Sequence, residues 1–137
     1  MESLLQKIKK NWEIHQLSVF KTKPENENFL KKPLKLILCV SGGCDSVSLL
    51  HLLQRLSTLL LLRLHVLHFN HKLRPEADNE QEFVNSLAKN YKIPFHYKTA
   101  KHLKLGQAGL QETARQWRIE ESMKILDNIG ADCIATG

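Results

Sequence analysis

Three absences bound what this chain of 137 residues can be. It has only three cysteines, Cys39, Cys44 and Cys133, and no two of them form a C-x-x-C pair. The sequence therefore predicts neither a disulfide framework nor a cysteine zinc site. Because sparse, unpaired cysteines are typical of a reducing compartment, we expect a cytoplasmic protein. Internal repeats and low-complexity tracts are also missing, so one ordinary globular unit is expected.

Long hydrophobic runs are missing as well. The first twelve residues, MESLLQKIKKNW, contain three lysines and do not have the apolar core of a signal peptide. The leucine-rich run 49–64 is interrupted too often for a membrane-spanning helix, by His51, Gln54, Arg55 and Arg63. We therefore expect a soluble protein without a membrane partner.

The composition that is present, 42% hydrophobic and 25% charged residues, is typical of a soluble globular domain. Twenty Lys and Arg residues against fourteen Asp and Glu residues give a formal net charge of +6. Such a charge attracts phosphate-rich partners, but it also serves solubility, and charge by itself leaves both interpretations open.

The chain divides into two parts by pattern. Leu4, Ile8 and Trp12 are spaced for one face of a basic amphipathic helix over residues 1–20, and the polar stretch KTKPENENFLKKP that follows is predicted to be a linker. Residues 1–33 are thus expected to form an N-terminal helix and linker. Residues 34–137 are expected to form the folded domain.

Within the domain, short apolar runs alternate with helical patterns. Strands are predicted over 34–40, 63–70, 92–98 and 132–136, and helices over 45–60, 78–91 and 109–129. We expect Asp78 to cap the second helix, with Gln81 completing a capping box. This order predicts an α/β fold, a three-layer parallel sheet with helices on both faces, and ligands bound beyond the carboxyl ends of the strands.

The stretch CVSGGCDSVSLL, residues 39–50, lies at such a carboxyl end. Gly42 and Gly43 allow positive φ and close approach of a ligand, the next helix directs its N–H groups at the loop, and Ser41 and Ser46 add hydroxyls. This pattern favours a bound phosphate over a plain turn with a Ser or Asp helix cap. Because the loop lacks the G-K-[ST] lysine, a polyphosphate would need Mg²⁺ or distant Lys and Arg for neutralisation.

SGGCDS resembles the pyrophosphate loop (PP-loop) of the N-type ATP pyrophosphatases. LHFNHKLRPEADNEQEFV (67–84), LQETARQWRIE (110–120) and ADCIATG (131–137) resemble, in the same order, three further blocks of the tRNA(Ile)-lysidine synthases. The similarity covers about residues 34–137, and it implies an adenine nucleotide alpha hydrolase-like, Rossmann-like domain.

The resemblance implies ATP and Mg²⁺ as cofactors, and as partners L-lysine and a tRNA(Ile) with a CAU anticodon. The wobble cytidine would be adenylated, and lysine would then displace AMP to give lysidine. The ATP loop would consist of Ser41, Gly42, Gly43, Cys44, Asp45 and Ser46. Asp45, Arg115 and Arg118 would be catalytic, the two arginines lying near phosphate or tRNA. No residue is assigned as a protein ligand of a metal.

The sequence departs from that family at its end. The family continues after ATG with a G-H-x-x-D-D segment, whereas this chain stops at Gly137, so we expect an incomplete and by itself inactive N-terminal portion. Two alternatives stay open, a non-catalytic nucleotide-binding fragment and a tRNA thiolase of the same superfamily. The thiolases commonly use C-x-x-C cysteines, which are missing here.

Two further patterns have ordinary explanations. His65 and His71 point to one side of a strand and His68 to the other, so the three are not expected to bind one metal, whereas His71 and Arg74 are candidates for lining the site. On residues alone, a solvated, ion-paired helix flank with Glu112 and Glu121 is the favoured interpretation of Arg115 and Arg118.

Overall fold

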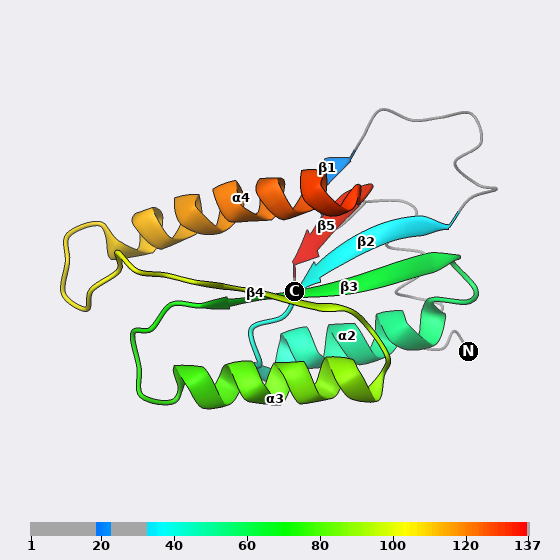
Figure 1. Cartoon of the computed structure of the whole chain (residues 1–137), viewed down its shortest axis with the longest axis horizontal. Coiled ribbons are helices and arrows are strands. Elements are labelled where there is room, and N and C mark those ends of the chain that lie inside the picture. The colour runs from blue at the N-terminus through cyan, green and yellow to red at the C-terminus, as the bar shows by residue number, and fades with distance from the viewer. Residues whose placement is uncertain (1–18, 23–32, 137) are drawn as a thin grey trace, which may run out of the picture.

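A computed structural model describes residues 19–22 and 33–136 of the chain (Figure 1). It contains one five-stranded sheet in the order β1-β5-β2-β3-β4. The strands are β1 (Val19–Thr22), β2 (Leu34–Cys39), β3 (Leu62–Asn70), β4 (Phe95–Thr99) and β5 (Cys133–Thr136). The helices are α2 (Cys44–Leu56), α3 (Ala77–Asn90) and α4 (Leu110–Ile129).

The central strand β2 sets the register of the sheet. It pairs parallel with β3 on one side, Leu36 opposite Leu64, and parallel with β5 on the other, Leu36 opposite Cys133. β4 continues the parallel part next to β3, and β1 pairs antiparallel with β5 at the far edge. The predicted parallel α/β sheet is confirmed, and the carboxyl ends of β2, β3 and β5 lie at one edge.

Helices cover both faces of the sheet, as predicted. Figure 1 shows α4 on one side and α2 with α3 on the other. Alternate residues of β2 pack on opposite faces of the sheet. Leu36 and Leu38 pack with α2 and α3, whereas Ile37 packs with Leu126 of α4. Consecutive residues buried on both faces are typical of a parallel strand. None of the helices within 33–136 is long and apolar enough to cross a membrane.

Besides β4, which begins at Phe95 where the strand was predicted from residue 92, the structure differs from the predicted elements at three places, two of them helix and linker boundaries. The helix predicted over 45–60 is α2 and ends at Leu56, because residues 57–61 turn tightly through Leu61, whose φ is +50°, into β3. Val19–Thr22 is a strand, where we predicted the end of a helix and the start of a linker. The rest of the predicted N-terminal helix and linker lies outside the described residues.

The third difference is the predicted cap of α3. The helix begins at Ala77, its N-terminus has no side-chain cap, and Asp78 and Gln81 do not form a capping box. Both side chains instead accept hydrogen bonds from the Asn70 amide, at 2.8 and 2.9 Å. Asn70 is 2% exposed at the end of β3. Because a buried amide is costly without partners, this tertiary contact uses the oxygens that a local cap would need.

Candidate functional site

The loop after β2 turns sharply at its first glycine. Gly42 has φ +93°, a backbone conformation that L-residues rarely adopt, whereas Gly43 is extended with φ −74° and ψ 164°. The prediction of positive φ is thus confirmed for Gly42 and wrong for Gly43. Gly42 also lies against α3, since a methyl group there would sit 3.6 Å from Val84 Cγ2 and 3.7 Å from Glu80 Cβ. Gly43 precedes α2 directly.

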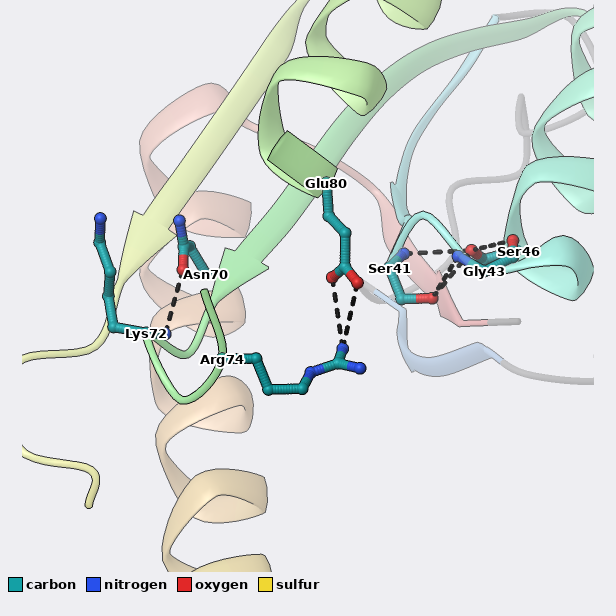
Figure 2. A network of polar contacts seen from close by, with 7 residues as sticks. All are labelled: Ser41, Gly43, Ser46, Asn70, Lys72, Arg74 and Glu80. Carbon is teal, nitrogen blue, oxygen red and sulfur yellow. Dashed lines mark hydrogen bonds and ion pairs between the residues drawn. The ribbon is translucent and has the colours of Figure 1, made fainter. Parts of the chain in front are cut away.

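Two serines hold the loop in shape (Figure 2). The Ser41 N–H donates to Ser46 Oγ at 3.1 Å, and the Gly43 N–H donates to Ser41 Oγ at 3.3 Å. The Ser46 hydroxyl, 5% exposed, donates to the Gly43 carbonyl at 3.2 Å, and the two hydroxyl oxygens lie 3.0 Å apart. The serines therefore bind the loop itself in this structure, which preorganises its backbone.

The N-terminus of α2 has no side-chain cap. The Ser or Asp cap that belongs to the plain-turn alternative is therefore not formed. The first N–H groups of a helix lack intrahelical partners, and the positive end of the helix dipole lies beside them. An uncapped N-terminus of this kind is the arrangement that binds anions in proteins.

A pocket of about 720 Å³ lies in front of the loop. The loop side of the pocket includes Ser41 and Ser46, and α4 lines it with Arg115, Arg118 and Ser122. The pocket also touches the ends of the central strands, at Cys39, Phe69 and Thr136. The fold thus brings the predicted loop and the two predicted arginines to one cavity, although they lie far apart in the sequence.

The two arginines are held differently. Arg115 is exposed and pairs with Glu112 at 3.5 Å, as the ion-paired flank predicts. Arg118 does not pair with Glu121, which contacts Lys98 and Lys124 instead. The Arg118 guanidinium donates to His71 Nε2 at 3.0 Å. Arg115 therefore fits either interpretation, whereas Arg118 is turned into the pocket.

His71 is the histidine that lines both pockets of the site. Burial, and then the nearby Arg118 charge, lower its pKa below the usual 6.5, so the ring is neutral near pH 7. His68 is buried with Nδ1 2.8 Å from the Val40 carbonyl, and His65 contacts His96. The three strand histidines do not converge, as predicted. Across residues 33–136 no three metal-ligating side chains form a cluster.

Asp45 and Cys44 begin α2, and both are exposed at the edge of the loop. Asp45 supplies a carboxylate beside the loop. Mg²⁺ in nucleotide sites is commonly held by one or two carboxylates together with phosphate oxygens and water. The residues present therefore fit a magnesium ion that arrives with a polyphosphate better than one held by the protein alone.

A second pocket of about 520 Å³ adjoins the first and shares Phe69, His71, Arg115 and Arg118 with it. Its other walls include Arg74, which the sequence singled out, and Glu80, which it did not. Glu80 reaches the site because α3 packs against the bend at Gly42. Nothing in the local pattern around Glu80 signals this, since the contact depends on how α3 packs against a separate loop.

The carboxyl edge of the sheet, with its glycine turn and the arginine-lined pocket, is the arrangement of an α/β nucleotide-binding protein. Within that class, the chain belongs to the PP-loop domain family, whose model matches residues 10–137. This family implies ATP binding.

Curated relatives include tRNA(Ile)-lysidine synthases. That of Petrotoga mobilis is 37% identical over 105 residues, 74% of this chain and 34% of the relative. That of Clostridioides difficile is 36% identical over 114 residues, 80% of this chain and 25% of the relative. The matched part thus spans about a third or less of these relatives' length.

Among solved structures, the U34-tRNA thiolase NcsA from Methanococcus maripaludis, determined with its [4Fe-4S] cluster, has a similar fold. The TM-score is 0.67 at 18% sequence identity, over 82% of this chain and 40% of that one. At this identity the likeness supports the Rossmann-like PP-loop fold and no particular activity.

Proposed function

We propose that this chain is the ATP-binding part of a cytoplasmic tRNA(Ile)-lysidine synthase. The observation that carries the proposal is the 720 Å³ pocket, which has the loop serines on one side and Arg115 and Arg118 on the other. The lysidine synthases that align with most of the chain are the reason for proposing this reaction. The substrates would be ATP, L-lysine and a tRNA(Ile) with a CAU anticodon.

The loop would hold the β- and γ-phosphates of ATP, which leave as pyrophosphate. Backbone N–H groups of Gly42 and Cys44, together with the uncapped start of α2, would bind the β- and γ-phosphates, whereas the Gly43 N–H donates to Ser41 Oγ. The hydroxyls of Ser41 and Ser46 fix that backbone in place. Mg²⁺, when bound, would neutralise the polyphosphate, and Asp45 would supply a carboxylate toward it.

The arginines of α4 would act on the other side of the pocket. In the proposed reaction the cytidine C2 oxygen attacks the α-phosphate, pyrophosphate leaves, and the ε-amine of lysine then displaces AMP. Charge builds up on the phosphate oxygens as pyrophosphate departs, and fixed guanidinium groups stabilise it. Arg118, turned into the pocket, suits the α-phosphate, and exposed Arg115 suits either phosphate or the tRNA backbone.

The cysteines argue against the thiolase alternative. Burial raises the pKa of Cys39 to about 11 and the pKa of Cys133 to about 12, so neither is a ready thiolate. These two also pack on opposite faces of the sheet, Cys133 with the α2 and α3 side and Cys39 with the α4 side. Cys44 is the exposed thiol beside the loop. Sulfur transfer would need thiols that meet.

The test has two stages. Calorimetric titration of the chain with ATP and Mg²⁺ asks whether the pocket binds nucleotide, with Asp45→Ala as the variant. Incubation with ATP, Mg²⁺, labelled lysine and a CAU tRNA(Ile), followed by nucleoside analysis, then separates the candidates. Lysidine that disappears in Asp45→Ala would support the lysidine synthase and show that the chain is active by itself, contrary to our expectation, and a thiolated nucleoside would support the thiolase. ATP binding without any tRNA product is the result expected of an ATP-binding part that is inactive by itself, and a nucleotide-binding module would give the same result. A chain that does not bind ATP contradicts the proposal.

A further inference from the structure

An ion pair stands directly beside the phosphate loop. The Arg74 guanidinium donates through one nitrogen, Nη2, to both carboxylate oxygens of Glu80, at 3.1 and 3.4 Å. The pair is open to solvent, since the side chains of Arg74 and Glu80 are 67% and 37% exposed. Ion pairs this exposed contribute little to stability, so a stronger anion can take the arginine.

The partner of Arg74 is also the neighbour of the loop. Glu80 Cβ lies 3.7 Å and its carbonyl oxygen 3.9 Å from where a methyl group on Gly42 would be. Figure 2 shows the Arg74 side chain extending from the turn after β3 toward the loop, below Glu80. Because β2 and β3 are parallel neighbours, the segments that follow them leave the same edge of the sheet. Arg74 therefore approaches the loop from the turn after β3 and not from α4.

The turn that carries Arg74 is built rigidly. Asn70 Oδ1 accepts the Lys72 N–H at 3.0 Å, and this holds Lys72 at φ +56°, an uncommon conformation for lysine. The Arg74 carbonyl accepts the Ala77 N–H at 3.1 Å and joins the turn to α3. A backbone fixed at both ends places the arginine, while its exposed side chain keeps the freedom to change partners.

The loop needs a cation that its own sequence lacks. It has no lysine at the position where other phosphate loops have one, and Arg115 and Arg118 approach from α4 across the pocket. Arg74 lies on the remaining side, in the adjoining pocket that shares both α4 arginines. A guanidinium there could bind phosphate oxygens through two parallel hydrogen bonds, which are shorter and stronger than its present contacts.

We propose that Arg74 is a phosphate-binding residue of this site, and that Glu80 holds it beside the loop until the phosphates of a nucleotide replace the carboxylate. The proposal rests on the proposed nucleotide site. It assigns Arg74 to the pyrophosphate end of the ligand, opposite the arginines of α4. Glu80 then competes with the ligand for Arg74, so that its removal strengthens binding.

The test is calorimetric titration of the chain with inorganic pyrophosphate and, separately, with ATP and Mg²⁺. Arg74→Gln should weaken both affinities about tenfold, because a charge-assisted bidentate contact is lost. The affinity of Arg74→Lys should lie between those of the wild type and Arg74→Gln, since lysine keeps the charge but loses the bidentate guanidinium geometry. Glu80→Gln should tighten binding severalfold. Matched controls with the same charge changes are Arg63→Gln at the opposite end of β3 and Glu82→Gln on α3, both exposed.

The outcomes separate the two proposals. If the wild-type chain binds neither pyrophosphate nor ATP, the nucleotide site itself fails, and the role of Arg74 with it. If the wild type binds and Arg74→Gln behaves like Arg63→Gln, the site stands and the role of Arg74 is overturned. Weaker binding in Glu80→Gln would show that Glu80 supports Arg74 rather than competing for it, which overturns that half of the proposal. Circular dichroism of each variant verifies that it is folded.

Discussion

Arg118 donates a hydrogen bond to His71 Nε2 across 47 positions of sequence, and the two side chains meet where both pockets join. The contact needs an imidazole without a proton on Nε2, which a neutral ring provides. The ring of Trp117 packs edge-on against His71, with centroids 5.6 Å apart, and limits its movement. Contacts from α4 thus restrict the position of His71, and the Arg118 charge adds to the effect of burial on its pKa.

We predict that the pKa of His71 depends on Arg118. Burial lowers this pKa first and the guanidinium charge lowers it further. Arg118→Gln keeps a donor of similar size but removes the charge, so the pKa of His71 should rise partway toward 6.5. An NMR titration of the histidine ring protons measures it. The His96 resonance is the internal reference, because its lowered pKa comes from burial alone. Equal pKa values of His71 in the wild type and in Arg118→Gln would contradict the prediction.

A second prediction concerns stability in mild acid. His65 Nδ1 and His96 Nε2 lie 3.0 Å apart with stacked rings, and burial, followed for His65 by the charges of His96 and Lys35, lowers the pKa of each. The folded protein therefore binds protons less readily than the unfolded chain. Its stability is fully present above pH 6.5 and falls as the pH drops below that value.

Chemical denaturation at a series of pH values measures this fall. In His96→Gln the neighbouring charge is gone, so stability should depend less steeply on pH below 6.5 than in the wild type. His71 contributes equally to both proteins and does not affect the comparison. An unchanged slope in the variant would show that the pair does not titrate on folding as predicted.

The two loop glycines should respond differently to alanine. Gly42→Ala forces a side chain into φ +93° and should destabilise the fold by about 1–3 kcal/mol. Gly43 has an ordinary extended φ, and a methyl group there would meet only Ser41 Oγ, at 3.4 Å. Gly43→Ala should therefore fold almost normally and lose ATP affinity, because the methyl group occupies space where phosphate approaches. Urea denaturation and calorimetry separate the two effects. Equal stability of both variants would contradict the reading of Gly42.

Sequence reasoning succeeded where local pattern and chain order decide the structure. The apolar run 34–40 stops at a glycine, and the helix predicted over 109–129 ends at Gly130, which has φ +65°. Alternation of strands and helices then predicts that segments following parallel strands meet at one edge. This reasoning placed the loop of Ser41 and Ser46 at the ligand-binding edge of the sheet, whereas Arg118 was placed near the site only by the resemblance to the lysidine synthases.

The features of the site that were not predicted depend on tertiary contacts, which compete with local ones and leave no local sequence pattern. Asp78 and Gln81 have the spacing of a capping box, yet the buried amide of Asn70 takes both oxygens. Gly43 looks like Gly42 in the sequence, and only the packing of α3 against the bend decides which of them needs positive φ. Glu80 enters the site through that same packing. These features follow from where α3 lies, which the sequence alone does not specify.

The last prediction is that tRNA binding by this chain is mainly electrostatic and that Arg115 takes part in it. The formal charge of +6 gives general attraction, and Arg115 stands exposed at the pocket, held only by a 3.5 Å surface pair with Glu112 that costs little to break. Each phosphate contact to duplex nucleic acid contributes about −0.9 to the slope of log affinity against log salt.

Filter binding of a tRNA(Ile) across a range of salt concentrations measures that slope. Arg115→Gln should weaken binding and make the slope shallower by about one contact, because a guanidinium that releases a counterion is lost. Arg63→Gln removes the same charge at the far end of β3, so it should leave the slope unchanged and lower the affinity only slightly through net charge. If both variants change the slope equally, attraction is spread over the whole surface and Arg115 has no particular role. A wild-type affinity that does not respond to salt would remove the electrostatic basis of the prediction altogether.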